Sequence, residues 1–119
     1  MRRLILAVVA LNASAALADE LDDAHRQALA GRDSYWNCLA REYSRDSNKG
    51  MSGEEFTALI AGACPSERQN LRVSLVSYLS MQHPLDVDAG DPIATANRAI
   101  ASAQKDVMTA FVRHKAVSK

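Results

Sequence analysis

The chain has 119 residues, of which 48% are hydrophobic and 5% aromatic, and its 14 Lys and Arg residues balance 14 Asp and Glu residues. This length predicts a single domain, and the absence of a basic excess argues against a nucleic-acid partner. Ala and Leu are frequent, Gly and Pro are few, and no useful run alternates between apolar and polar residues. The sequence therefore predicts an all-α protein.

The N-terminus has the features of a secretory signal peptide. Arg2 and Arg3 precede a short apolar run at residues 4–11, and the sequence Ala16-Leu17-Ala18 provides the small residues of a cleavage site. The apolar run is shorter than the roughly 20 residues that cross a bilayer. We expect a signal peptide over residues 1–18, and the alternative is a buried N-terminal helix.

Cleavage after Ala18 leaves one helical domain at residues 19–119, with 12 Lys and Arg residues against 14 Asp and Glu residues. No later segment is apolar enough to span a membrane. The mature protein is therefore expected to be periplasmic or secreted, without a membrane span.

The first helix is predicted over residues 20–45. Its apolar positions recur at three- and four-residue steps, which is the period of an α-helix with one buried face. They include Leu21, Ala24, Ala28, Tyr35 and Cys38. Gly31 interrupts this helix and costs about 1 kcal/mol relative to alanine. We expect it to be a surface glycine, and the alternatives are a kink or a close helix contact.

Three of the six aromatic residues, Tyr35, Trp36 and Tyr43, lie within nine positions of this helix. Neighbouring residues on a helix point about 100° apart, so Tyr35 and Trp36 cannot be equally buried. We expect both to lie in the core, at the edge of a wide apolar stripe. In the alternative, one of them faces a partner, and Trp36 and Tyr43 are the candidate partner surface.

A second helix is predicted to begin near Gly53. It follows a polar break at residues 46–50, and Ser52 and Glu55 have the spacing of a capping box, in which each side chain bonds the other residue's backbone N–H.

Pro65 falls inside this second segment and removes one helical hydrogen bond. The apolar face continues through Leu71 and Leu75 without a change of phase, so we expect one kinked helix that ends near Gln82. The alternative is two helices separated by a break near residues 62–64.

The last helix is predicted from Pro92 to about Ala116. Asp91 is a good N-cap, and proline suits the first helical position. His83 precedes a proline and should end the previous helix, which leaves residues 85–90 as a loop. Three long helices with short connections predict a small up-and-down bundle.

Cys38 and Cys64 are the two cysteines of the chain. In an oxidising compartment, two cysteines in a small domain typically form a disulfide. We expect this bond to join the first helix to the second. The alternatives are two free thiols or a bond between molecules.

The segment from Asp46 to Phe56 resembles the calcium-binding loop of the EF-hand family, and the resemblance implies Asp46, Asn48 and Glu55 as ligands. Asp46 to Glu55 spans ten residues, whereas the family loop has about twelve, and one acidic ligand is missing. A polar turn followed by a helix cap explains the same residues. We therefore predict no metal and no cofactor, with binding of calcium, another metal or a small ligand as the alternative function.

No catalytic motif stands out in the sequence. A nucleophile elbow, a Cys-x-x-Cys pair and a haem-attachment motif are all absent, and His25, His83 and His114 lack the spacing of metal ligands. We therefore expect no enzymatic activity.

The pattern Cys38-Leu39-Ala40-x-x-Tyr43-x-x-Asp46 is similar to the first helix of one family of immunity proteins. The overall plan of the chain resembles the small, exported, single-disulfide helical proteins of proteobacterial envelopes, which include acid-stress chaperones and immunity proteins. The resemblance implies a non-catalytic periplasmic protein that acts on another envelope protein as an inhibitor, immunity protein or stress factor.

Overall fold

The computed structural model describes the backbone of residues 2–82 and 90–117, and within these ranges the side chains from residue 16 onward. The described ranges contain four α-helices, α1 (Arg2–Ser44), α2 (Gly53–Gly62), α3 (Pro65–Gln82) and α4 (Pro92–Val117), and one short 3₁₀ helix, η1 (Asp46–Asn48). All regular secondary structure in these ranges is helical, which confirms the predicted all-α class.

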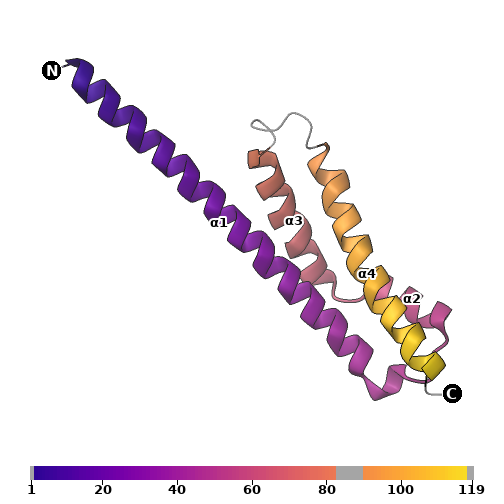
Figure 1. Ribbon diagram of the computed structural model, residues 1–119. Helices are drawn as coiled ribbons and strands as arrows, with labels where there is room; N and C mark the ends of the chain where they lie inside the picture. The colour runs from indigo at the N-terminus through magenta and orange to yellow at the C-terminus, as the bar shows by residue number, and fades with distance from the viewer. Residues whose placement is uncertain (1, 83–89, 118–119) are drawn as a thin grey trace.

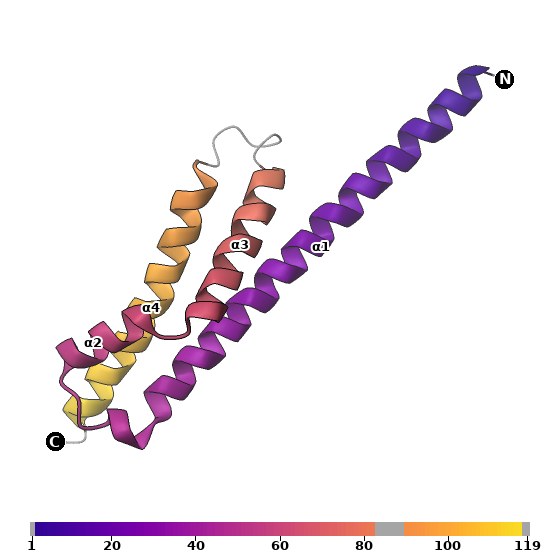
Figure 2. The ribbon, with the colours of Figure 1, turned by 180° about the vertical axis from the view of Figure 1, so that it is seen from behind.

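The three long helices run up and down beside one another, with α3 between α1 and α4 (Figures 1 and 2). The short helix α2 lies against α4 near the end where α1 finishes. The molecule measures 78 × 25 × 22 Å, because the N-terminal part of α1 extends well beyond the other helices (Figure 1).

Helix α1 begins much earlier than the predicted helix, at Arg2 instead of residue 20. Residues 16–20 are exposed to solvent, and the first buried side chain of the described part of α1 is Ala24. A cleavage after Ala18 would therefore remove no described core residue, and the signal peptide stays a prediction. In the described ranges, no helix is both long enough and apolar enough to cross a membrane.

The prediction of one kinked second helix is wrong, and the alternative of two helices is correct. Helix α2 ends at Gly62, Ala63 is extended, and Cys64 takes a left-handed conformation with φ of 55°. Pro65 cannot donate a backbone hydrogen bond and disfavours a helical conformation at Cys64. The chain therefore leaves the helix for two residues, and α3 restarts with proline in its favoured first position.

The prediction that Gly31 is a surface glycine is also wrong. A Cβ atom at this position would lie 2.9 Å from Ser74 Oγ and 3.3 Å from the Cα of Leu71. The glycine therefore lets α1 and α3 approach closely.

The starts of α2 and α4 predicted from the sequence are confirmed. Ser52 Oγ accepts from the backbone N–H of Glu55 at 3.1 Å, and the Glu55 carboxylate accepts from the N–H of Ser52 at 3.4 Å. Asp91 caps α4 by accepting from the N–H of Ile93 at 3.1 Å. His83 and residues 85–89 of the predicted loop lie outside the described residues.

The core is concentrated where α1, α2 and α4 meet. Phe56 of α2 stacks on Phe111 of α4 with ring centres 3.9 Å apart, and Tyr35 is completely buried with its hydroxyl accepting a 3.0 Å hydrogen bond from Gln104. The buried cluster contains Tyr35, Leu39, Phe56, Ile60, Cys64, Leu71, Ile100, Ala103, Val107 and Phe111.

Candidate functional site

A disulfide joins Cys38 to Cys64, as the sequence predicts. The two Cα atoms are 6.1 Å apart, which is within the usual range for this bond. Cys38 belongs to α1, whereas Cys64 lies between α2 and α3 and not inside a second helix. The bond therefore fastens the end of α1 to the junction of the next two helices.

Glu67 lies beside this disulfide, and its carboxylate and the two sulfur atoms fall within 4.8 Å of one another. Two thiolates and a carboxylate could hold a zinc-like ion. In the oxidised protein the two sulfurs are bonded to each other, so they are not available as thiolate ligands. This proximity could not be predicted from the sequence, because it depends on the break before α3.

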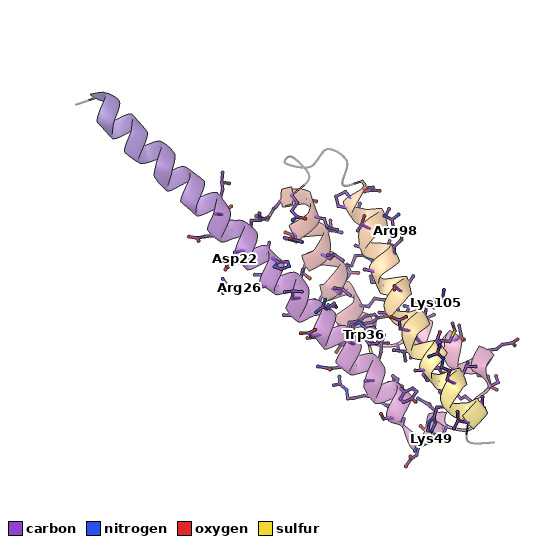
Figure 3. All side chains as sticks on the ribbon, viewed as in Figure 1. Asp22, Arg26, Trp36, Lys49, Arg98 and Lys105 are labelled. Carbon is purple, nitrogen blue, oxygen red and sulfur yellow. A yellow bond between two sulfur atoms is a disulfide. The ribbon has the colours of Figure 1, made fainter. Side chains whose placement is uncertain are left out.

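Trp36 lines a cavity of about 390 Å³ at the seam between α1 and α4, with α3 as its floor. Figure 3 shows Trp36 on the side of α1 that faces the other two long helices. The residue is half-buried, in contrast to the fully buried Tyr35. The expectation that both aromatic rings belong to the core thus holds fully for Tyr35 alone, and Trp36 packs at the core's edge.

Polar groups surround the apolar floor of this seam cavity. Arg32 stands on the α1 side and Asp106 on the α4 side, and both are exposed. At the open end of the bundle, the ring of His25 lies 4.9 Å from that of Tyr78. The floor consists of Leu71 and Leu75. The seam is therefore an apolar groove with one basic and one acidic wall.

Tyr43 lies one heptad beyond Trp36 on α1 but lines a different cavity, at the end of the bundle where α1 and α4 finish. It is half-buried, and its ring meets that of His114 edge-on with centres 6.3 Å apart. The two residues predicted as a partner surface therefore share a side of α1 and line two separate cavities.

The three residues implied as calcium ligands have other partners. Asp46 pairs with Lys49 at 2.9 Å. The buried amide of Asn48 donates to the Glu42 backbone carbonyl at 2.9 Å and closes the turn after α1. Glu55 completes the capping box of α2. These contacts fit a polar turn, and calcium binding stays the alternative, which calorimetry would test.

The hydrogen bond from Lys49, and then its positive charge, lower the pKa of the Asp46 carboxyl below its ordinary value of 3.8. The same carboxylate is highly exposed, with 93% of its side chain accessible. It therefore stays ionised to lower pH than an isolated aspartate.

Comparisons with protein-family models, curated proteins and solved structures gave no match. The function must therefore be inferred from the residues and their geometry.

Proposed function

We propose that this is an exported, non-catalytic protein that works by binding another envelope protein, as an inhibitor, immunity protein or stress factor. The observation that carries the proposal is the seam cavity, where Trp36 is half-buried between α1 and α4. Tryptophan is the residue type most enriched among the side chains that dominate binding energy at interfaces.

The walls of the seam define the chemistry of the partner. Helix α3 packs closely on both α1 and α4, whereas α1 and α4 have few contacts with each other, which leaves room for a fourth element between them. An apolar groove of this kind accepts the apolar face of an amphipathic helix. Arg32 and Asp106 then favour a helix with an acidic residue on one flank and a basic residue on the other.

One further observation is in keeping with the exported part of the proposal. The disulfide in the oxidised chain is in keeping with export.

The test is capture of a partner from periplasmic extract by the oxidised protein, at neutral and at acid pH. We expect the original sequence to recover one defined partner, and the variants Arg32→Glu and Asp106→Arg to lose it. Arg98→Glu is the matched control, because Arg98 is exposed on α4 and does not line the seam (Figure 3).

Fluorescence gives a second readout, since Trp36 is the one tryptophan of the chain. Its emission should shift to shorter wavelength when the purified partner covers the seam. The proposal fails if the original sequence recovers no partner in either condition, or if Arg32→Glu binds as well as Arg98→Glu.

A further inference from the structure

The cavity beside Tyr43 has a different character from the seam. Its volume is about 460 Å³, which is within the range of small-molecule sites. Two stretches that are distant in sequence form it: the end of α1 with the turn after η1, and the last turns of α4. The lining residues are Tyr43, Ser44, Lys49, Phe111, His114 and Lys115. We call this the basic aromatic pocket.

The wall of the basic aromatic pocket is held in place by the core. Phe111 is buried and stacks on Phe56 with the ring planes only 9° apart. Tyr43 and His114 meet edge-on beside it. Phe111 therefore forms a fixed base of the pocket, and the rings of Tyr43 and His114 offer surface beside it to an apolar group of similar size.

Two lysines, Lys49 and Lys115, line the pocket beside these rings. Lys115 is half-buried, donates a hydrogen bond to the backbone carbonyl of Met51, and lies 5.8 Å from the centre of the Phe111 ring. An ammonium has three N–H donors, so this anchored group keeps donors for a ligand. Lys49 is exposed on the opposite segment.

None of the described residues that line the pocket is acidic, and Tyr43 and Ser44 add hydroxyl groups. Among the described residues, Lys49 pairs with the carboxylate of Asp46, which is exposed and is not one of the lining residues. A ligand carboxylate entering the pocket would compete with Asp46 for the same ammonium. Positive groups beside an aromatic wall select a ligand that is anionic at one end and apolar at the other.

We propose that the basic aromatic pocket binds a carboxylate attached to an apolar body. The carboxylate lies between Lys49 and Lys115, and the apolar body rests against Tyr43 and Phe111. Such a group can come from a small organic acid or from the C-terminus of a peptide. This site is separate from the seam, so the proposal does not depend on the proposed function.

The test uses the oxidised protein and three probes: 3-phenylpropionate, its neutral analogue 3-phenylpropanol, and inorganic phosphate. Backbone amide shifts in an NMR titration report the site and the affinity. We expect 3-phenylpropionate to shift the amides of Tyr43, Lys49 and Lys115, and to bind more tightly than the alcohol and than phosphate. Added salt should weaken this binding because it screens the charges.

Two variants move the affinity in opposite directions. Lys49→Gln removes an ammonium and should weaken binding about two- to fivefold, which is the range of an exposed ion pair. Asp46→Asn removes the competing carboxylate and should tighten binding by a similar factor. Lys105→Gln is the control, because Lys105 is exposed on α4 and lies outside the pocket (Figure 3). It should leave the affinity unchanged.

A short peptide that ends in phenylalanine distinguishes the two sources of the ligand. Tighter binding of the free-acid peptide than of 3-phenylpropionate assigns the pocket to a peptide terminus, and the reverse order assigns it to a small acid. The C-terminal amide of the peptide should bind poorly in either case. The proposal is overturned if no probe binds below about 10 mM, if the acid and the alcohol bind equally, or if Asp46→Asn does not tighten binding.

Discussion

The two ends of the bundle are built differently. At the end that carries the disulfide, which we call the disulfide half, the large side chains of Tyr35, Leu39, Phe56 and Ile60 are fully buried. At the other end, the open half, much of the buried surface comes from alanines at positions 24, 28 and 96, while Val73 and Ile93 remain more than half exposed.

The two halves hold their helices together in different ways. Large buried side chains remove much apolar surface from water, and each contributes about 1.5–3 kcal/mol. Alanines and Gly31 allow close approach of the backbones but bury little surface each. We therefore expect the disulfide half to set the stability of the molecule, and the open half to be the part that opens first.

Removing one ring of the stacked pair should have the largest effect. Phe56→Ala leaves a cavity against Phe111 in the disulfide half, and we expect it to lower the free energy of unfolding by about 3–5 kcal/mol. Val73→Ala, an exposed site in the open half, should change it by less than about 0.5 kcal/mol. Urea unfolding of both variants checks the comparison, and similar losses from the two would refute it.

Removing the disulfide should have the second-largest effect on the free energy of unfolding. The bond closes a loop with a sequence separation of 26 residues, and the chain-entropy model gives a loss of about 3.5 kcal/mol when the loop is opened. We expect the double variant Cys38→Ser/Cys64→Ser to melt at a much lower temperature than the oxidised protein. Hydrogen exchange should show that α2 loses more protection than the last turns of α3. If reduction leaves the melting temperature unchanged, the disulfide is not a structural clamp.

The glycines provide a smaller and more local test. Gly31→Ala places a methyl group against the backbone of Leu71, and we expect the contact to outweigh the gain in helix propensity, with a net loss of about 1 kcal/mol. Gly62→Ala meets no atom within 4 Å and should not destabilise the protein. Thermal melts of the pair measure the difference. Equal melting temperatures would show that α1 and α3 are not closely packed at Gly31.

The smallest effect concerns the exposed pair of Asp46 and Lys49. The lowered pKa of Asp46 in the folded state means that its contribution to stability is present above the unfolded pKa. That contribution is lost as the pH falls through the folded pKa, below the ordinary value of 3.8. An NMR titration should show that Lys49→Gln raises the Asp46 pKa. An unchanged pKa would mean that Lys49 does not hold the carboxylate.

The sequence predicts the features of the fold that depend on neighbouring residues. The capping box of Ser52 and Glu55, the Asp91 cap and the helical period each follow from contacts within a turn or two, and all of them agree with the structure. The two cysteines could likewise be paired, because no other cysteine competes.

The features missed by the sequence depend on how helices meet. The break at residues 63–64 was ranked below a kink because the apolar face keeps its phase on both sides of it. Gly31 was misplaced because its neighbours, Ser74 and Leu71, come from another helix. Both cavities depend on the spacing between α1 and α4, for which the sequence pattern contains no signal.

Cys64 combines two demands at one position. Its sulfur forms the disulfide, and its backbone takes a left-handed conformation with φ of 55°, which costs an L-residue roughly 1–2 kcal/mol and glycine almost nothing. Replacing Cys64 by glycine therefore removes the bond and relieves the turn at once, whereas serine removes the bond alone. In a Cys38→Ser background, the difference in the free energy of unfolding between these two replacements would measure the cost of the left-handed backbone conformation at position 64.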